Sequence, residues 1–110
     1  MIARIWHGRT RAEHADAYLD YLKETPVGDV RAVPGNLGLQ VWKRVQGSEA
    51  EFLFVSYWPS LEAVREFAGE DLEKAVYYPR DREYLMELEP NVAHYEVALD
   101  ARTRFPTVHE

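Results

Sequence analysis

The segment from Phe52 to Trp58 constrains the fold of this chain more than any other, because nearly every position of its sequence FLFVSYW is apolar or aromatic. A run this short and this apolar is typical of a strand that is buried on both faces of a sheet. Pro59 and Ser60 follow directly and end the strand. The chain is therefore expected to build a sheet around a covered central strand.

A helix is expected to follow this strand. Ser60 stands at the N-cap position. Three apolar residues then share one side of the predicted helix: Val64, Phe67 and Ala68. Gly69 interrupts the helix, and Asp71 is expected to cap a continuation that runs to Val76 before Pro79 ends it.

The other elements are read from periodicity and from turn residues. Thr10 and Glu13 have the spacing of a capping box and predict the start of a helix. In chain order, we expect a strand at residues 1–7, a helix at about 11–24, a loop at 25–36, a strand at 37–45, a short helical turn at 81–86 and a strand at 92–99.

The resulting order is β-α-β-β-α-β, which is typical of a ferredoxin-like α+β fold. Its four-stranded antiparallel sheet would have the strand order 4-1-3-2, with both helices on one face. The first and third strands carry apolar side chains on both faces, so the open face needs a cover. We therefore expect a homodimer that pairs through the open sheet faces, forming a dimeric α+β barrel. Residues 1–99 would form one domain, followed by a polar tail at 100–110.

Composition narrows the class of partner. The chain has 46% hydrophobic residues, seven Tyr, four Phe and three Trp, which indicates a globular domain with an aromatic core. Its net charge of −6 argues against nucleic acid and against an anionic membrane, so a small neutral or aromatic ligand fits better. There is no cysteine, no apolar run of membrane-spanning length and no signal-like N-terminus, so we expect a cytoplasmic protein.

At this point the sequence resembles the antibiotic biosynthesis monooxygenase family of dimeric α+β barrel proteins. The resemblance follows the element order over residues 1–99. It is best between Val55 and Tyr77, including Trp58-Pro59-Ser60, and again in the last strand at His94-Tyr95-Glu96-Val97. It implies a pocket between each sheet and its own helices, and a cofactor-independent oxygenase or a related activity, since this fold hosts several chemistries.

The resemblance also implies an alternative, which is binding or degradation of haem. The haem-degrading branch has an Asn at the end of the first strand, a Trp in the second helix and a haem-ligating His at the end of that helix. The matching positions here are His7, Phe67 and Tyr77, so all three differ. Haem iron would then need Tyr77 or His7 as its ligand. We therefore favour the cofactor-free branch.

Cofactor-free oxygenation needs a base, aromatic walls and the exclusion of water. His7 is the expected base, because it ends the first strand on the side of Ala3 and Ile5, which should face the pocket. His94 would lie near His7, since the last strand begins beside the end of the first. Each histidine is more often a partly buried, hydrogen-bonded residue than a catalytic one. The four histidines are too scattered in the sequence to predict a metal site.

Aromatic residues supply the remaining candidates. Tyr77 is the expected orienting hydroxyl and Tyr78 a rim residue, because consecutive helical residues point about 100° apart. Trp58 and Phe67 are expected as walls, although residues at such spacing more often belong to a core. Arg80 would neutralise a phenolate or a carboxylate, although a surface ion pair is its commoner role.

The sequence thus predicts a monooxygenase that oxidises a quinol-like or polycyclic phenolic substrate with O₂. The expected catalytic residues are His7 and Tyr77, and the expected substrate contacts are Trp58, Phe67, Tyr78, Arg80 and His94. A dimer that binds a small ligand without chemistry is the non-enzymatic alternative.

Overall fold

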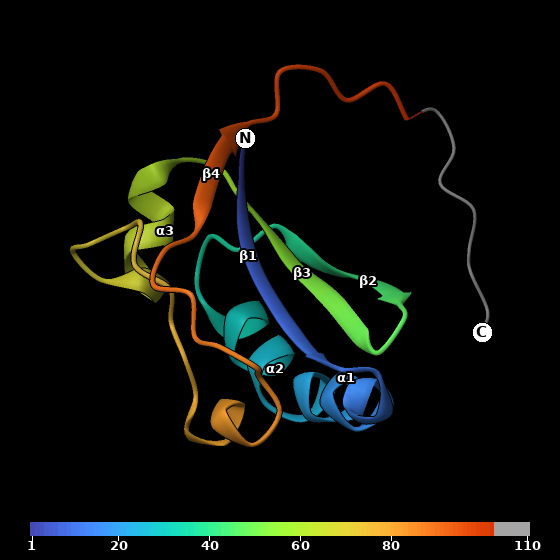
Figure 1. The fold of residues 1–110 in the computed structure, drawn as a ribbon. Helices are drawn as coiled ribbons and strands as arrows, with labels where there is room; N and C mark the ends of the chain where they lie inside the picture. The colour runs from blue at the N-terminus through green and yellow to red at the C-terminus, as the bar shows by residue number, and fades with distance from the viewer. Residues whose placement is uncertain (103–110) are drawn as a thin grey trace.

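The computed structural model describes residues 1–102 of the chain (Figure 1). Its elements, in order, are β1 (Ile2–Arg11), the 3-10 turn η1 (Ala12–His14), α1 (Ala15–Glu24), α2 (Pro26–Ala32), β2 (Gly38–Gln46), β3 (Glu49–Trp58), α3 (Leu61–Ala68), the 3-10 turn η2 (Pro79–Glu83) and β4 (Ala93–Glu96). The tail expected at residues 100–110 lies outside the described residues from 103 onward. None of the helices within residues 1–102 is long and apolar enough to cross a membrane.

The four strands form one antiparallel sheet in the order β2-β3-β1-β4, so the expected topology is confirmed. β1 and β3 are the two central strands and pair along their whole length, from Ile2 opposite Trp58 to Arg11 opposite Glu49. β2 and β3 are joined by a tight turn in which Gly47 has a φ of 63°, a conformation that favours glycine.

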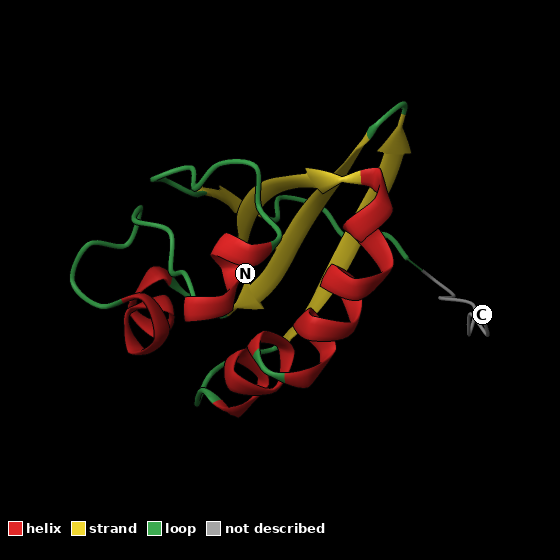
Figure 2. Ribbon diagram, turned by 60° about the horizontal axis from the view of Figure 1, so that its bottom comes forward, coloured by secondary structure: helices red, strands yellow, loops and turns green. Residues whose placement is uncertain are grey.

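The helices lie on one side of the sheet (Figure 2). Two clusters of buried residues join the layers. In the first, α1 packs Tyr18 and Leu22 against Phe52 of β3. In the second, Val30 of α2 and Val64 of α3 pack around Trp58, which is fully buried. Burial of these large apolar side chains is the main force that holds helices to sheet.

Strand pairing assigns each side chain of β1 to a face. Residues opposite one another share a face, and the partner of Ile2 is Trp58, which lies in the helix-side core. Because side chains alternate along a strand, the even-numbered residues of β1 face the helices. The odd-numbered ones, including Ala3, Ile5 and His7, face away from them.

Several elements differ from the sequence prediction. β1 continues to Arg11, beyond the strand expected at residues 1–7, and α1 begins at Ala15 instead of near residue 11. Residues 26–32 form α2 instead of a loop, because Pro26 occupies the first turn of a helix, where its missing N–H costs nothing. The expected capping box fails, because Thr10 is still in β1 and its hydroxyl donates to the carbonyl of Arg11. The helical turn expected at 81–86 is instead the 3-10 turn η2 at Pro79–Glu83. β4 is shorter than the strand expected at 92–99.

The expected continuation of the second helix is also absent. Gly69 ends α3 with a φ of 81°, and residues 70–78 contain no helix. This segment instead pairs with the chain before β4, through hydrogen bonds from the Ala75 N–H to the Pro90 carbonyl and from the Val92 N–H to the Glu73 carbonyl. The N-cap of α3 is confirmed, since the Ser60 hydroxyl accepts from the Ala63 N–H at 3.3 Å.

Candidate active site

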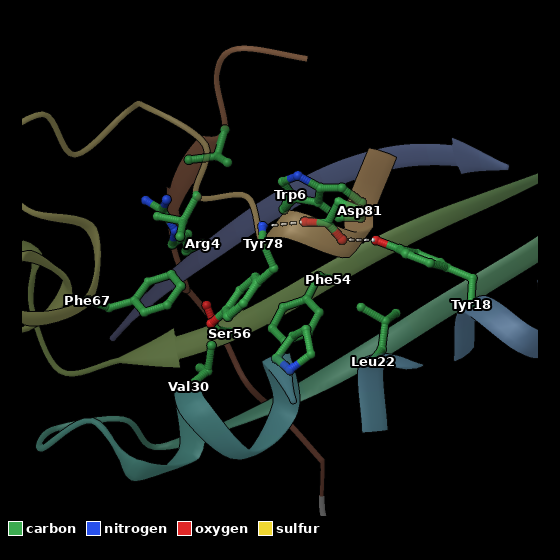
Figure 3. Close-up of a pocket in the computed structure, with 13 residues that line it drawn as sticks. Arg4, Trp6, Tyr18, Leu22, Val30, Phe54, Ser56, Phe67, Tyr78 and Asp81 are labelled. Carbon is green, nitrogen blue, oxygen red and sulfur yellow. Dashed lines mark hydrogen bonds between the residues drawn. The ribbon is translucent and has the colours of Figure 1, made fainter. Parts of the chain in front are cut away.

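A cavity lies between the helix side of the sheet and the segment that follows α3 (Figure 3). About 510 Å³ of space inside it is free of atoms, and this figure includes open solvent at the mouth. Its walls are mostly apolar or aromatic. They are formed by Arg4, Trp6, Tyr18, Leu22, Pro26, Val30, Phe54, Ser56, Phe67, Val76, Tyr78, Asp81 and Val92.

Asp81 is the one carboxylate in this wall. It is the third residue of η2, is only 4% exposed, and has no ion-pair partner among the described residues. Its Oδ2 accepts a 2.7 Å hydrogen bond from the Tyr78 N–H, and its Oδ1 accepts from the Tyr18 hydroxyl at 3.4 Å. Burial raises the pKa of this carboxyl, and the two hydrogen bonds only partly oppose that effect. Asp81 is therefore a buried acid that can take up a proton more readily than an ordinary aspartate.

Two tyrosines stand beside this carboxylate in the cavity wall. Burial and the nearby Asp29 raise the pKa of Tyr78 to about 12. Burial, reinforced by Asp81, also raises the pKa of Tyr18. Both hydroxyls thus stay protonated and can donate hydrogen bonds. The Tyr18 hydroxyl donates to Asp81, whereas Tyr78 donates to Asp81 through its backbone N–H and has its hydroxyl near Asp29.

Arg4 lines the same cavity from β1 and is 3% exposed. Its Nη1 donates to the Leu72 carbonyl at 2.6 Å and its Nη2 to the Lys74 carbonyl at 3.0 Å, which ties residues 70–78 to the sheet. The guanidinium lies 5.7 Å from the centroid of the Phe67 ring. Burial lowers its pKa to about 10, so the side chain remains charged at neutral pH.

His7 does not line the cavity, and its expected orientation was wrong. It lies on the same face as Ala3 and Ile5, but that face points away from the helices and from the cavity. Its Nδ1 and Nε2 lie 2.6 Å from Glu89 and 2.9 Å from Glu51. Partial burial acts to lower the pKa of His7, but these hydrogen bonds outweigh it and the pKa is raised.

His94 lies on the opposite face from His7, because it pairs with Arg4 of β1. Its Nε2 is 3.1 Å from Nη1 of Arg4, and burial followed by the charge of Arg4 lowers its pKa. This contact fits a neutral His94 ring whose Nε2 accepts a hydrogen bond from Nη1–H of Arg4. His94 therefore positions Arg4 at the edge of the cavity and does not approach His7.

The aromatic candidates separate into two groups. Phe67 and Tyr78 line the cavity. Trp58 lies behind Phe67, with ring centroids 6.3 Å apart and planes at 22°, and belongs to the core. Tyr77 points elsewhere: its hydroxyl donates to the Glu89 carbonyl at 2.5 Å and its ring meets the edge of Trp6. Tyr78, and not Tyr77, is thus the tyrosine that reaches the cavity.

Arg80 does not line the cavity. It is exposed, pairs with Glu83 at 3.1 Å and lies over the rings of Tyr21 and Tyr84. This is the surface ion pair that its sequence context favoured as the simpler interpretation.

The cavity does not offer haem iron a suitable protein ligand. None of the residues that form its walls is His, Cys or Met. Tyrosine is the wall residue type that can ligate haem iron, but the Tyr18 hydroxyl is bonded to Asp81 and the Tyr77 hydroxyl is engaged outside the cavity. Among residues 1–102, no group of three or more His, Cys, Asp or Glu side chains is arranged to hold a metal ion.

Sequence reasoning missed the two charged residues of the cavity. Asp81 sits in the polar run PRDRE, which resembles a solvated turn, and Arg4 is an isolated charge in an apolar strand. The isolated charge was an available signal, because Arg is almost never fully buried without a partner. The burial of Asp81 depends on packing of η2 against α1, which is distant in sequence.

Comparison with solved structures shows the same fold in several proteins. A Bacillus cereus protein assigned to the antibiotic biosynthesis monooxygenases is 14% identical, with a TM-score of 0.66, over 93% of this chain and 97% of the other. A second antibiotic biosynthesis monooxygenase is 18% identical, with a TM-score of 0.63, over 90% and 100%. The haem degrader MhuD from Mycobacterium tuberculosis, solved with two haems bound in its active site, is 23% identical, with a TM-score of 0.59, over 93% and 100%.

Among curated proteins, none matches the chain in sequence. The family model for antibiotic biosynthesis monooxygenases matches residues 1–77, which include the first three strands, the three α-helices and most of the segment that closes the cavity. On this match, and with the fold it shares with the proteins above, the chain belongs to the antibiotic biosynthesis monooxygenase family.

Proposed function

We propose that this protein is a cofactor-independent monooxygenase that oxidises a quinol-like or polycyclic phenolic substrate with O₂. The observation that carries the proposal is the buried carboxylate of Asp81 in the wall of an aromatic cavity. Chemistry of this kind requires little more than a base, a dry pocket and a substrate that can itself donate electrons to O₂. Asp81 takes the role of base that the sequence suggested for His7, because His7 lies on the other face of the sheet.

The pKa of Asp81 suits it to this role. An ordinary phenol has a pKa near 10 and an ordinary aspartate a pKa near 4, so proton transfer between them is uphill. Burial raises the pKa of Asp81 and narrows this gap. General-base assistance is worth about 10²–10⁴ in rate. The hydroxyl of Tyr18 lies 3.4 Å from the carboxylate and can orient the substrate oxygen, and Tyr78 adds its ring to the same wall.

The reaction balances without an added reductant. Asp81 takes the phenolic proton, and the phenolate donates electrons to O₂ to form a carbon–oxygen bond at a ring carbon that carries hydrogen. Loss of that hydrogen as a proton, cleavage of the O–O bond and return of the first proton from Asp81 then release one water. The phenol and O₂ thus yield a quinone and water, and each product receives one of the two atoms of O₂.

We also propose that two copies pair through the sheet face opposite the helices. Trp42 and Tyr95 on that face are 47% and 60% exposed, and Ile5 and Leu53 lie between them. A cluster of exposed apolar side chains of this kind usually marks an interface. Pairing of these faces would give the dimeric barrel expected from the sequence.

The proposal is tested by oxygen uptake with metal-free, haem-free protein and a panel of hydroquinones, anthrones and naphthols. We expect uptake with at least one compound, a loss of about 10²–10⁴ in kcat for Asp81→Asn, and little change for His7→Ala. Asn keeps the size of Asp81 and an acceptor for the Tyr78 N–H. Full activity of Asp81→Asn would overturn the assignment of the base. Saturable binding of the panel with no uptake would indicate the non-catalytic ligand binder.

Haem binding is tested separately by titrating haemin and following the Soret band. With no suitable axial ligand in the cavity wall, we expect no saturable one-to-one shift. A stoichiometric shift that is lost in Tyr78→Phe would restore the haem alternative.

A further inference from the structure

We propose that Arg4 binds an anionic group of the substrate, a carboxylate in particular, at the opposite end of the cavity from Asp81. The substrate class would then be an aromatic hydroxy acid, held with its phenol at Asp81 and its carboxylate at Arg4. This inference rests on the proposed function for the chemistry, but its binding component stands on Arg4 alone.

The first observation is that Arg4 is a buried charge with no opposite charge beside it. It is 3% exposed, and its hydrogen-bond partners are two backbone carbonyls and the His94 ring, which are all neutral. No carboxylate within residues 1–102 forms an ion pair with it. Carbonyl groups solvate a guanidinium but leave its charge in place.

The second observation is the location of this charge in the wall of an apolar cavity. Coulomb interactions are several times stronger in such a site than in water, so an anion that enters the cavity gains from Arg4 and also relieves its unpaired burial. Buried arginines are rare without a partner, and the missing partner can be supplied by the ligand.

The third observation concerns the donors that remain. A guanidinium has five N–H donors, and three are used, by the carbonyls of Leu72 and Lys74 and by His94. The Nε–H and one Nη2–H have no partner among the described residues. Two donors are the number that a carboxylate accepts in a bidentate pair.

The fourth observation is the arrangement of the two charges. Arg4 and Asp81 lie apart in the cavity wall, and the backbone of Tyr78, which is bonded to Asp81, lies between them in the view of Figure 3. Arg4 extends from β1, whereas Asp81 belongs to η2. A ligand with an acid at one end, a phenol at the other and aromatic carbon between them would match both charges and the apolar walls. The flat ring of Phe67 beside Arg4 adds a surface on which an aryl group can pack.

The test measures binding under nitrogen, so that no turnover occurs. Dissociation constants are determined for a matched pair, 6-hydroxy-2-naphthoic acid and its primary amide, at pH 7. We expect the wild type to prefer the acid by about tenfold or more, Arg4→Lys to keep part of this preference, and Arg4→Gln to lose it. Arg80→Gln is the control, because Arg80 is an exposed arginine outside the cavity and its loss should leave the preference intact.

Equal affinity of the wild type for acid and amide would overturn the inference, as would a preference for the acid that survives in folded Arg4→Gln. If Arg4→Gln does not fold, the inference is judged from the ratio of the acid and amide dissociation constants in the wild type and in Arg4→Lys. The inference and the proposed function can fail separately. If the protein consumes oxygen with neutral phenols but binds acid and amide equally, only the inference about Arg4 is rejected. If the protein binds the acid more tightly but consumes no oxygen with any phenol, only the proposed oxygenase activity is rejected.

Discussion

The backbone N–H of Tyr78 donates a 2.7 Å hydrogen bond to Oδ2 of Asp81, and this bond holds a buried carboxylate beside an aromatic wall of the cavity. The same bond stabilises the start of η2, so Asp81 serves both the local fold and the site. Separating these two roles requires a substitution that keeps the acceptor and removes the charge. Asp81→Asn does this.

Asp81→Asn is expected to abolish the acidic limb of the pH profile. The base must be ionised to work, so kcat/KM of the wild type should rise with pH through the raised pKa of Asp81 and then level off. The Asn variant should show a low rate without this limb. Steady-state kinetics between pH 4 and pH 8 measure the profile. If kcat/KM of the variant rose over the same pH range and to the same value as in the wild type, the titrating group would not be Asp81.

The same carboxyl makes the stability of the protein depend on pH. The folded-state pKa of Asp81 is raised, so the folded state resists ionisation more than the unfolded state does. Wild-type stability should therefore fall as pH rises from the ordinary aspartate value through the raised one, while Asp81→Asn lacks this loss. Thermal unfolding at several pH values compares the two. A wild type that gains stability relative to Asn over this range would contradict the direction of the shift.

Gly8 is expected to be essential for the shape of the cavity. A Cβ atom at this position would lie 2.2 Å from Cη2 of Trp6 and 3.1 Å from Cδ2 of Leu85, so the indole that lines the cavity would have to move. Gly8→Ala should destabilise the fold by about 1–3 kcal/mol, as overpacking usually does, and weaken the binding of aromatic ligands.

Urea unfolding and ligand titration test this expectation. Gly28→Ala is the matched control, since a Cβ there meets no atom within 4 Å and Ala is the better helix former. If Gly8→Ala bound ligand and unfolded like the wild type, the close approach of Trp6 would have no consequence.

His7 is expected to be a stability residue. Partial burial lowers its pKa, but hydrogen bonds to Glu89 and Glu51 outweigh this and raise it. Its stabilising effect should be complete below the ordinary histidine pKa of about 6.5 and disappear as pH rises through the raised value. The difference in melting temperature between wild type and His7→Gln should therefore shrink as pH rises. A difference that is constant from pH 5 to pH 9 would argue against a charged His7.

Trp42→Glu is expected to prevent pairing of the sheet faces. Trp42 is 47% exposed on the face opposite the helices, and a buried, unpaired carboxylate at the interface would be strongly unfavourable. Sedimentation velocity should show a dimer for the wild type and a monomer for the variant. Leu61→Glu is the control, because Leu61 is 44% exposed at the start of α3 and lies outside that face. A monomeric wild type, or equal effects of both substitutions, would reject this interface.

The order of the strands could be predicted because the signals were local and strong. The apolar run at Phe52–Trp58 and the N-cap at Ser60 mark a central strand and the helix after it, and both are confirmed. Helix α2 was missed because Pro26 and Gly28 resemble loop residues when their positions within a helical turn are unknown. The extended segment after Gly69 depends on contacts with Arg4 and with residues 90–92, which no local pattern reveals.

The site was harder to predict because the apolar pattern of β1 is misleading. Ala3 and Ile5 suggested that the odd-numbered face met the pocket, but the helix side of this strand carries Arg4 and Thr10, which are both buried polar residues. A one-residue shift in register reverses every side chain, and His7 was assigned to the cavity for this reason. Phe67, expected as a wall, lines the cavity, and so does Tyr78, which was expected at the rim while Tyr77 was expected inside.

The most direct test of the oxygenase is the fate of the oxygen atoms. The wild-type protein is supplied with ¹⁸O₂ and the best phenol of the panel, and the quinone is reduced at once so that its carbonyl cannot exchange with water. We expect one ¹⁸O atom in each quinone molecule, no label from H₂¹⁸O, and product formation about 10²–10⁴ times slower with Asp81→Asn. Unlabelled product formed together with hydrogen peroxide would contradict it, because the protein would then remove electrons without inserting oxygen.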